Sequence, residues 1–130
     1  MEALKEAIDA RKISLSHVRH ILSGDENLRS FLESAENYPK YSPLHHAVAK
    51  DHWELSKLLI EEFRVNPNAT CKYGDGDRAT VLHIAAYFGS ENCLRQLLNW
   101  SGPALNPNLV GMFEGCAGTP AEVAKQRNHR

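Results

Sequence analysis

The histidines are the residues whose types and spacing first suggest chemistry. His45, His46 and His52 lie within eight residues, and imidazole nitrogens are common zinc ligands. Adjacent residues face different directions on a helix, however, and no carboxylate or thiol stands at ligand spacing beside this group. His17 and His20 are three residues apart on an expected helix, where we favour a solvated face over a weak metal site. The sequence therefore predicts no metal site and no cofactor.

Other candidate sites lack parts that their chemistry needs. The segment Asp75-Gly76-Asp77 resembles the start of a calcium loop, but no glutamate follows at the twelfth position, and a tight turn fits better. Cys71, Cys93 and Cys116 are 22 and 23 residues apart, which suits neither a disulfide framework nor a zinc site and indicates reduced thiols. Phosphate loops, nucleophile elbows and paired acid–base carboxylates are also missing. We therefore expect a protein that is not an enzyme.

Composition limits the partners. A chain of 130 residues forms one ordinary domain. Its net charge of −1 disfavours non-specific nucleic-acid binding, which requires a basic face. No apolar run approaches the length of a membrane-spanning helix, so membrane insertion is not expected. The first residues lack the apolar stretch of a signal peptide, which favours a cytoplasmic or nuclear location.

One short phrase occurs three times along the chain. It reads S-P-L-H-H-A at residues 42–47, T-V-L-H-I-A at 80–85 and T-P-A-E-V-A at 119–124. Counted from residues 44, 82 and 121, the copies stand 38 and 39 residues apart. A fixed period of this size indicates stacked supersecondary units.

Each phrase has the chemistry of a helix start. Ser42, Thr80 and Thr119 can accept a hydrogen bond from a free backbone N–H group. Pro43 and Pro120 follow at the first helical position, where proline is well tolerated. Each phrase is therefore expected to begin a helix.

A second helix is expected in each of the first two units. Asp51 and Gly89 mark the end of the first helix. Apolar residues then recur at helical spacing: Leu55, Leu58 and Leu59 in one unit, and Leu94, Leu97 and Leu98 in the next. Asn-Pro-Asn at 66–68 and at 106–108 is expected to end these second helices.

These residues resemble the ankyrin-repeat family. The family signature T-P-L-H-x-A is matched closely by the first two copies and weakly by the third, which lacks both leucine and histidine. The resemblance implies an all-α solenoid of stacked helix-turn-helix units with β-hairpin fingers. His45 and His83 resemble the family's buried histidine, whose ring ties neighbouring turns together.

The repeat register divides a single domain, residues 1–130, into four parts. These are a degenerate N-terminal capping repeat (1–37), two repeats (38–75 and 76–114) and a partial repeat (115–130). The capping repeat is predicted from helical spacing alone. One expected helix carries Leu4, Ala7 and Ile8, and a second carries Val18, Ile21 and Leu22.

The last unit looks incomplete. Residue 130 falls where a second helix should begin, and Ala121 and Val123 are therefore expected to lack a covering helix. We expect the chain to be a fragment that continues into further repeats or other domains.

The fingers are expected to be elongated. An ordinary unit of the family has about 33 residues, and the excess here lies in segments 66–80 and 106–119. Residues 73–77 have strong turn chemistry for a finger tip. The linker between the capping repeat and the first repeat is also long, and Leu28, Phe31 and Leu32 in it have helical spacing.

The resemblance implies that protein partners bind on the concave face and the fingers. Transferred by register, that face holds four aromatic residues with three basic residues around them: Tyr38, Tyr41, Tyr87, Phe88, Lys50, Arg78 and Arg127. Aromatic anchors dominate many interfaces, so we expect a scaffold or adaptor, acting as a monomer, that binds an extended or helical protein segment with acidic character. The alternative for Tyr87 and Phe88 is that they only pack against the fingers.

Two further functions remain open. The chain could be the regulatory ankyrin domain of a larger kinase, channel or transcription regulator. It could also be the substrate of an asparaginyl hydroxylase, because members of the family are modified at asparagines that end second helices. Asn66 and Asn106 partly fit that pattern, although both precede proline.

Overall fold

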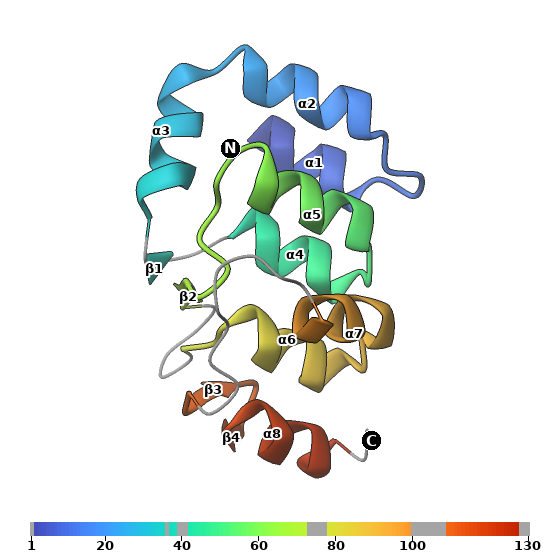
Figure 1. The fold of residues 1–130 in the computed structure, drawn as a ribbon, viewed down its shortest axis with the longest axis vertical. Coiled ribbons are helices and arrows are strands. Elements are labelled where there is room, and N and C mark those ends of the chain that lie inside the picture. The colour runs from blue at the N-terminus through green and yellow to red at the C-terminus, as the bar shows by residue number, and fades with distance from the viewer. Residues whose placement is uncertain (1, 36, 39–41, 73–77, 100–108, 128–130) are drawn as a thin grey trace.

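The computed structural model describes residues 2–35, 37–38, 42–72, 78–99 and 109–127 (Figure 1). The helices are α1 (Glu2–Asp9), α2 (Leu15–Ser23), α3 (Glu26–Ser34), α4 (Pro43–Ala49), α5 (Trp53–Glu61), α6 (Val81–Phe88), α7 (Glu91–Asn99) and α8 (Pro120–Gln126). The strands are β1 (Asn37–Tyr38), β2 (Thr70–Cys71), β3 (Gly111–Phe113) and β4 (Cys116–Gly118). Within these residues no helix has the length and apolar character needed to cross a membrane.

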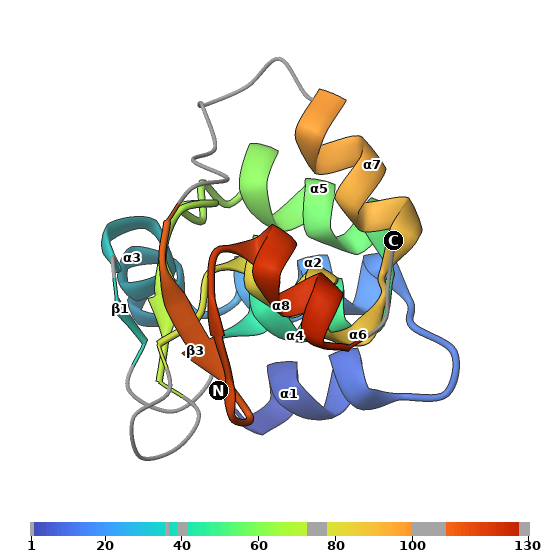
Figure 2. The ribbon, with the colours of Figure 1, turned by 90° about the horizontal axis from the view of Figure 1, so that it is seen from below.

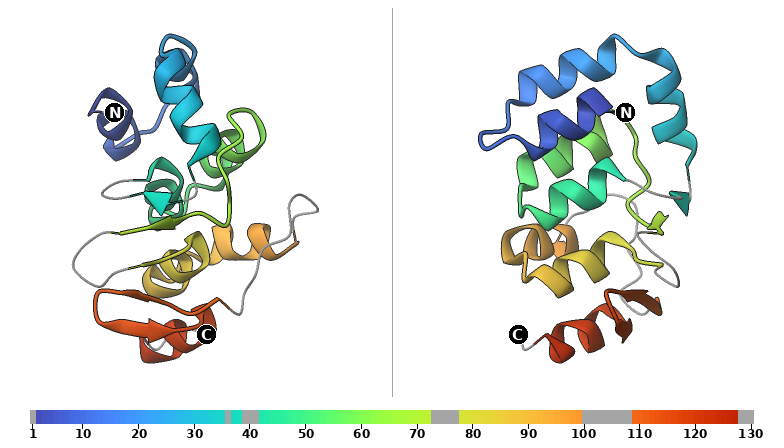
Figure 3. Two further views of the ribbon diagram at one scale, coloured as in Figure 1. Left: turned by 90° about the vertical axis from the view of Figure 1, so that its left-hand side faces the viewer. Right: turned by 180° about the vertical axis from the view of Figure 1, so that it is seen from behind.

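The helices form two rows along the long axis of the molecule. Helices α1, α4, α6 and α8 make one row, in which each contacts the next. Helices α5 and α7 contact each other in the second row, and the ion pair between Arg19 and Glu62 joins α2 to the residue that directly follows α5. Figure 2 looks along the stack and shows α4, α6 and α8 apart from α5 and α7, while Figure 3 shows the pairs from two sides. The predicted helix-turn-helix solenoid is confirmed.

The predicted helix starts are also confirmed. The Ser42 hydroxyl accepts a hydrogen bond from the His45 N–H at 3.3 Å. Thr119 and Glu122 form a reciprocal capping box, with distances of 3.3 and 3.0 Å between side-chain oxygens and backbone nitrogens. Thr80 occupies the equivalent position before α6. Each repeated phrase therefore begins a helix of the first row.

Left-handed residues end the first helices of the two central units. Asp51 has φ 56° and Gly89 has φ 65°, a conformation that reverses the chain after a helix. The N–H of His52 then donates to the carbonyl of Ala47 at 3.0 Å. Asp51 performs this role without being glycine because its short polar side chain tolerates the left-handed region.

The Asp51 carboxylate also reaches the next unit, where it accepts the N–H of Cys93 in the first turn of α7 at 2.8 Å. Asp51→Ala is expected to lower the free energy of unfolding by about 2 kcal/mol, because it removes this cap and leaves an alanine at positive φ. Urea unfolding followed by circular dichroism measures the loss. Asp51→Asn is the matched control, since asparagine keeps both the acceptor and the tolerance of positive φ. Equal stability of the two variants would contradict this role.

The second helix α5 ends earlier than expected. Its last residue is Glu61, five residues before the Asn-Pro-Asn segment, so the prediction that this proline ends the helix is wrong. Arg64 adopts φ 55°, and the N–H of Val65 donates to the carbonyl of Leu59 at 3.0 Å. A left-handed turn at Arg64 therefore ends the helix. The second such segment, 106–108, lies outside the described residues.

The long linker after the capping repeat contains a helix, as its spacing predicted. In α3, Leu28 and Leu32 are buried and Phe31 is 42% exposed. The N-terminus is capped by Asp25, whose carboxylate accepts the Leu28 N–H at 3.0 Å. This third helix is an addition to the regular helix pair.

The strands connect the fingers of successive units. Strand β1 pairs in parallel with β2, and β3 pairs in antiparallel fashion with β4. Two isolated bridges, Cys71 with Ala79 and Arg78 with Met112, link these pairs. The result is a ladder of backbone pairs from β1 to β4. The predicted finger tip at 73–77 lies outside the described residues.

Helix α8 is better covered than the sequence suggested. Val123 is completely buried, because α8 packs along α6 and against β4. The expectation that Val123 lacks cover is therefore wrong, although Ala121 is exposed as expected.

Candidate partner-binding surface

Two histidines hold the fingers against the helices. The Nε2 of His45 lies 2.8 Å from the carbonyl oxygen of Ala79, and the Nε2 of His83 lies 2.9 Å from that of Gly118. Both carbonyls belong to the finger of the next unit, so each ring joins two units. The structural role predicted for these histidines is confirmed.

The geometry favours neutral rings. Burial lowers the pKa of His45 to about 4 and also lowers the pKa of His83. The Nε2–H group donates to the finger carbonyl, which leaves Nδ1 as an acceptor; at His83 this atom accepts the Thr80 N–H at 3.2 Å. No group of three histidine, cysteine or acidic residues that could hold a metal occurs in the part of the chain that the structure describes.

Three aromatic rings meet where α6 ends and the second finger turns. The Tyr87 ring centroid lies 4.9 Å from that of Phe88 and 4.7 Å from that of Phe113, with edge-on geometry. Phe113 is only 6% exposed, whereas Phe88 is 47% exposed. Tyr87 packs against the finger through Phe113 and keeps part of its side chain accessible, while half of the Phe88 side chain faces solvent. The alternative that these two rings only pack stays a prediction.

Arg127 and Lys50 make similar contacts at different levels of the stack. The Arg127 guanidinium lies 4.2 Å from the Tyr87 ring centroid, and its Nε donates to the Tyr87 carbonyl at 3.3 Å. Lys50 Nζ donates to the carbonyl of Asp9 at 3.2 Å. Each basic side chain thus satisfies a carbonyl near the end of the preceding helix in its row. Both remain exposed, but part of their hydrogen-bonding capacity is already used.

Arg78 and its neighbours in β3 extend this surface along the finger. The backbone of Arg78 exchanges two hydrogen bonds of 2.9 Å with Met112, and the Arg78 side chain is exposed. Met112 is 37% exposed and Val110 is 75% exposed. Sequence reasoning did not place these two apolar residues on the surface, although alternation with the buried Phe113 would have indicated it.

Tyr38 does not belong to this surface. It was predicted as an exposed anchor, but its side chain is 1% exposed. The ring packs edge-on against Phe31 at 5.6 Å, and the hydroxyl donates to the Leu32 carbonyl at 3.5 Å. Burial raises the pKa of Tyr38 to about 12. Tyr38 is therefore a core residue that packs against α3. Tyr41, another of the predicted anchors, lies outside the described residues.

Asn66, a candidate for hydroxylation, is half-buried in the turn after α5. Its side-chain oxygen accepts the N–H of Asn68 at 2.9 Å. Modification of Asn66 stays a prediction, and an intact mass without a one-oxygen adduct would remove it. Asn106 lies outside the described residues.

Comparison with known proteins agrees with this architecture. A family model described as ankyrin repeats (3 copies) matches residues 6–109, which is most of the chain. A search of curated proteins found no match. The matched segment contains the paired helices, the contact of His45 with Ala79 and the pairing of β1 with β2 described above. The chain belongs to the ankyrin-repeat family.

Proposed function

We propose that this protein is a scaffold or adaptor that binds a protein segment on the surface formed by Arg78, Tyr87, Phe88, Met112 and Arg127, which we call the finger–helix surface. Ankyrin-repeat domains are generally protein–protein interaction modules and are typically not catalytic.

The observation that carries the proposal is the position of Phe88. Its ring is half exposed, yet its contacts with Tyr87 and Phe113, at 4.9 and 5.7 Å between centroids, hold the exposed half in place. A rigid, partly exposed aromatic ring loses little conformational entropy on binding and is typical of interface hot spots.

Charge indicates the partner's character. Arg78 and Arg127 are exposed near this cluster, and the net charge of the whole chain is only −1, so the positive charge is local. A partner segment with an apolar side chain for Phe88 and nearby acidic residues fits this combination.

Phe88→Ala tests the proposal against a matched control. Phe31→Ala removes another aromatic ring of similar exposure, 42% against 47%, at a different place in the fold. Immobilised wild type and variants are used to capture proteins from a cell lysate, which quantitative mass spectrometry compares. We expect the amount of specifically captured protein to fall about tenfold with Phe88→Ala, which corresponds to a loss of about 1.4 kcal/mol in binding free energy. Phe31→Ala is expected to capture these proteins as the wild type does. The same yield from all three baits would refute the proposed surface.

A further inference from the structure

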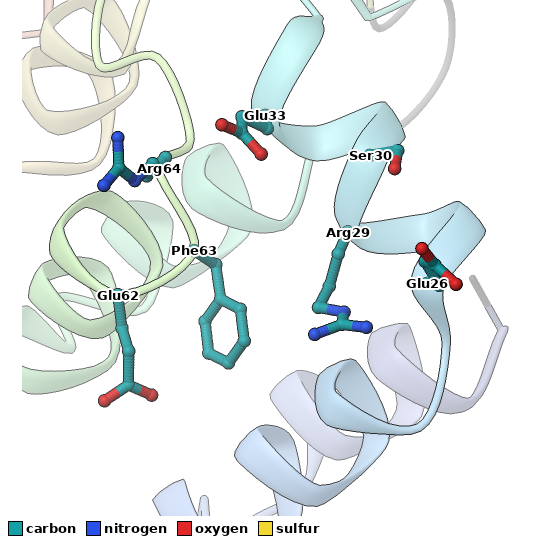
Figure 4. Close-up of a pocket in the computed structure, with 7 residues that line it drawn as sticks. All are labelled: Glu26, Arg29, Ser30, Glu33, Glu62, Phe63 and Arg64. Carbon is teal, nitrogen blue, oxygen red and sulfur yellow. The ribbon is translucent and has the colours of Figure 1, made fainter.

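Two places on the surface carry arginine side chains in different surroundings. The cleft between α3 and the residues that follow α5 (Figure 4) is lined by two arginines and three glutamates, so its charges favour no single class of ligand. Arg127, which directly follows α8, is different. It is exposed, it lies on the Tyr87 ring, and it forms no ion pair with any residue that the structure describes.

The Arg127 side chain is held in place by Tyr87. The guanidinium carbon lies 4.2 Å from the centroid of the Tyr87 ring, which covers one face of the group, and Nε donates to the Tyr87 carbonyl at 3.3 Å. The two terminal nitrogens of Arg127 form no hydrogen bond with a described residue. A guanidinium binds a carboxylate through two parallel N–H groups in its plane. The edge formed by the terminal nitrogens is therefore already oriented for such a ligand.

An earlier unit shows which group Arg127 lacks. Lys50 and Arg127 hold the same position, the C-cap, of α4 and α8, and each donates to a carbonyl near the end of the preceding first-row helix. Lys50 Nζ also lies 3.8 Å from the Asp9 carboxylate. Helix α6 ends instead in Tyr87 and Phe88, which carry no carboxylate. The acidic group that Lys50 receives from its own chain is therefore absent at Arg127.

Phe88 lies on the other side of Tyr87 from this unfilled position. Its ring centroid is 4.9 Å from that of Tyr87, so the exposed Phe88 ring and the exposed Arg127 guanidinium both contact one residue. In an extended segment, alternate side chains point to the same side and are about 7 Å apart. A segment that crosses this place can therefore set an apolar side chain on Phe88 and an acidic one on Arg127.

We propose that Arg127 is a carboxylate-binding site for an extended partner segment, which carries an aspartate or glutamate two residues away from an apolar side chain. The carboxylate binds the terminal nitrogens of Arg127, and the apolar side chain packs on Phe88. This inference rests on the proposed function, because it uses the finger–helix surface. It adds the residue that recognises the acid and the spacing that the partner must have.

A library of random octapeptides displayed on phage is the probe. We expect the peptides enriched by the wild-type protein to share an apolar residue and an aspartate or glutamate two positions apart. In a synthetic copy of the most enriched peptide, replacing the acidic residue by its amide is expected to weaken binding about tenfold. The Nε–Hε NMR signal of Arg127 in ¹⁵N-labelled protein is expected to shift with the acidic peptide. No shift of this signal, or the same shift with the amide analogue, would overturn the proposal.

Two variants separate a carboxylate site from general positive charge. Arg127→Lys keeps the charge but loses the planar edge, and it is expected to bind the peptide about fivefold more weakly. Lys125→Gln removes a charge from an exposed position of the same helix and is expected to bind as the wild type does. Equal affinities of the wild type and Arg127→Lys would contradict the carboxylate site, and so would an equal loss with Lys125→Gln.

The two proposals can fail separately. Peptides whose binding is lost with Phe88→Ala but kept with Arg127→Gln would support the finger–helix surface and overturn the carboxylate site. Peptides that bind Phe88→Ala as tightly as the wild type would overturn both proposals. A selection in which the wild-type protein enriches no peptide would also overturn both.

Discussion

Gly111→Ala is expected to lower the free energy of unfolding by about 3 kcal/mol, because a β-carbon at this position has no space. It would overlap the carbonyl oxygen of Arg78 and lie 2.9 Å from ring atoms of His83. That carbonyl accepts the N–H of Met112, and His83 binds Gly118. Neither neighbour can move without breaking the contacts between β3 and the rest of the stack.

Urea unfolding followed by far-ultraviolet circular dichroism measures this effect, with Gly24→Ala as the control. Gly24 ends α2 at φ −89°, and a β-carbon there would meet its nearest atom at an ordinary 3.5 Å. The control is expected to change stability by no more than about 0.5 kcal/mol. If Gly111→Ala is as stable as Gly24→Ala, the close packing of β3 on His83 is incorrect.

Acid is expected to destabilise the protein through His45. Its pKa is about 4 in the folded state, against about 6.5 in an unfolded chain. Between these values the unfolded state binds more protons, so stability is complete above pH 6.5 and falls as the pH is lowered through that range towards 4. The contribution of His45 alone is about 3 kcal/mol. Urea unfolding at several pH values between 4 and 7.5 measures the slope.

Two variants assign this slope to His45. His45→Gln removes the titrating group and can still donate to the Ala79 carbonyl, so its stability is expected to vary less with pH. His17→Gln makes the same substitution at an exposed histidine and is the control for the exchange itself. The ring signal of His45 in an NMR titration is expected to have its midpoint near pH 4; a midpoint near 6.5 would contradict the prediction.

Local sequence signals predicted most of the helices correctly. Ser42 and Thr119 cap the starts of α4 and α8. In each case the hydroxyl accepts a hydrogen bond from the backbone N–H group three residues later, so the contact lies within one helical turn. The spacing of Leu28 and Leu32 predicted α3 for a similar reason, since both residues lie on one helical face. Such features depend on neighbours in the sequence and are independent of the rest of the fold.

The surface was predicted less well because it depends on contacts between distant residues. Tyr38 turned inward because α3, absent from an ordinary repeat, supplies Phe31 and the Leu32 carbonyl to surround it. The interaction of Arg127 with Tyr87 spans 40 residues. No spacing rule predicts which carbonyl a long basic side chain will reach. The cleft between α3 and the residues after α5 was missed for the same reason, because its two walls come from separate units.

The two histidine contacts also determine how the molecule opens. Each ring belongs to one unit and binds the finger of the next, so releasing a finger also removes a contact from the helix behind it. We infer that the stack opens stepwise, because loss of the His83–Gly118 contact releases the β3–β4 hairpin while His45 still holds Ala79. Backbone amides in β3 and β4 are expected to exchange with solvent deuterium before those around Ala79, because the His83–Gly118 contact is only partly buried whereas the His45–Ala79 contact is buried.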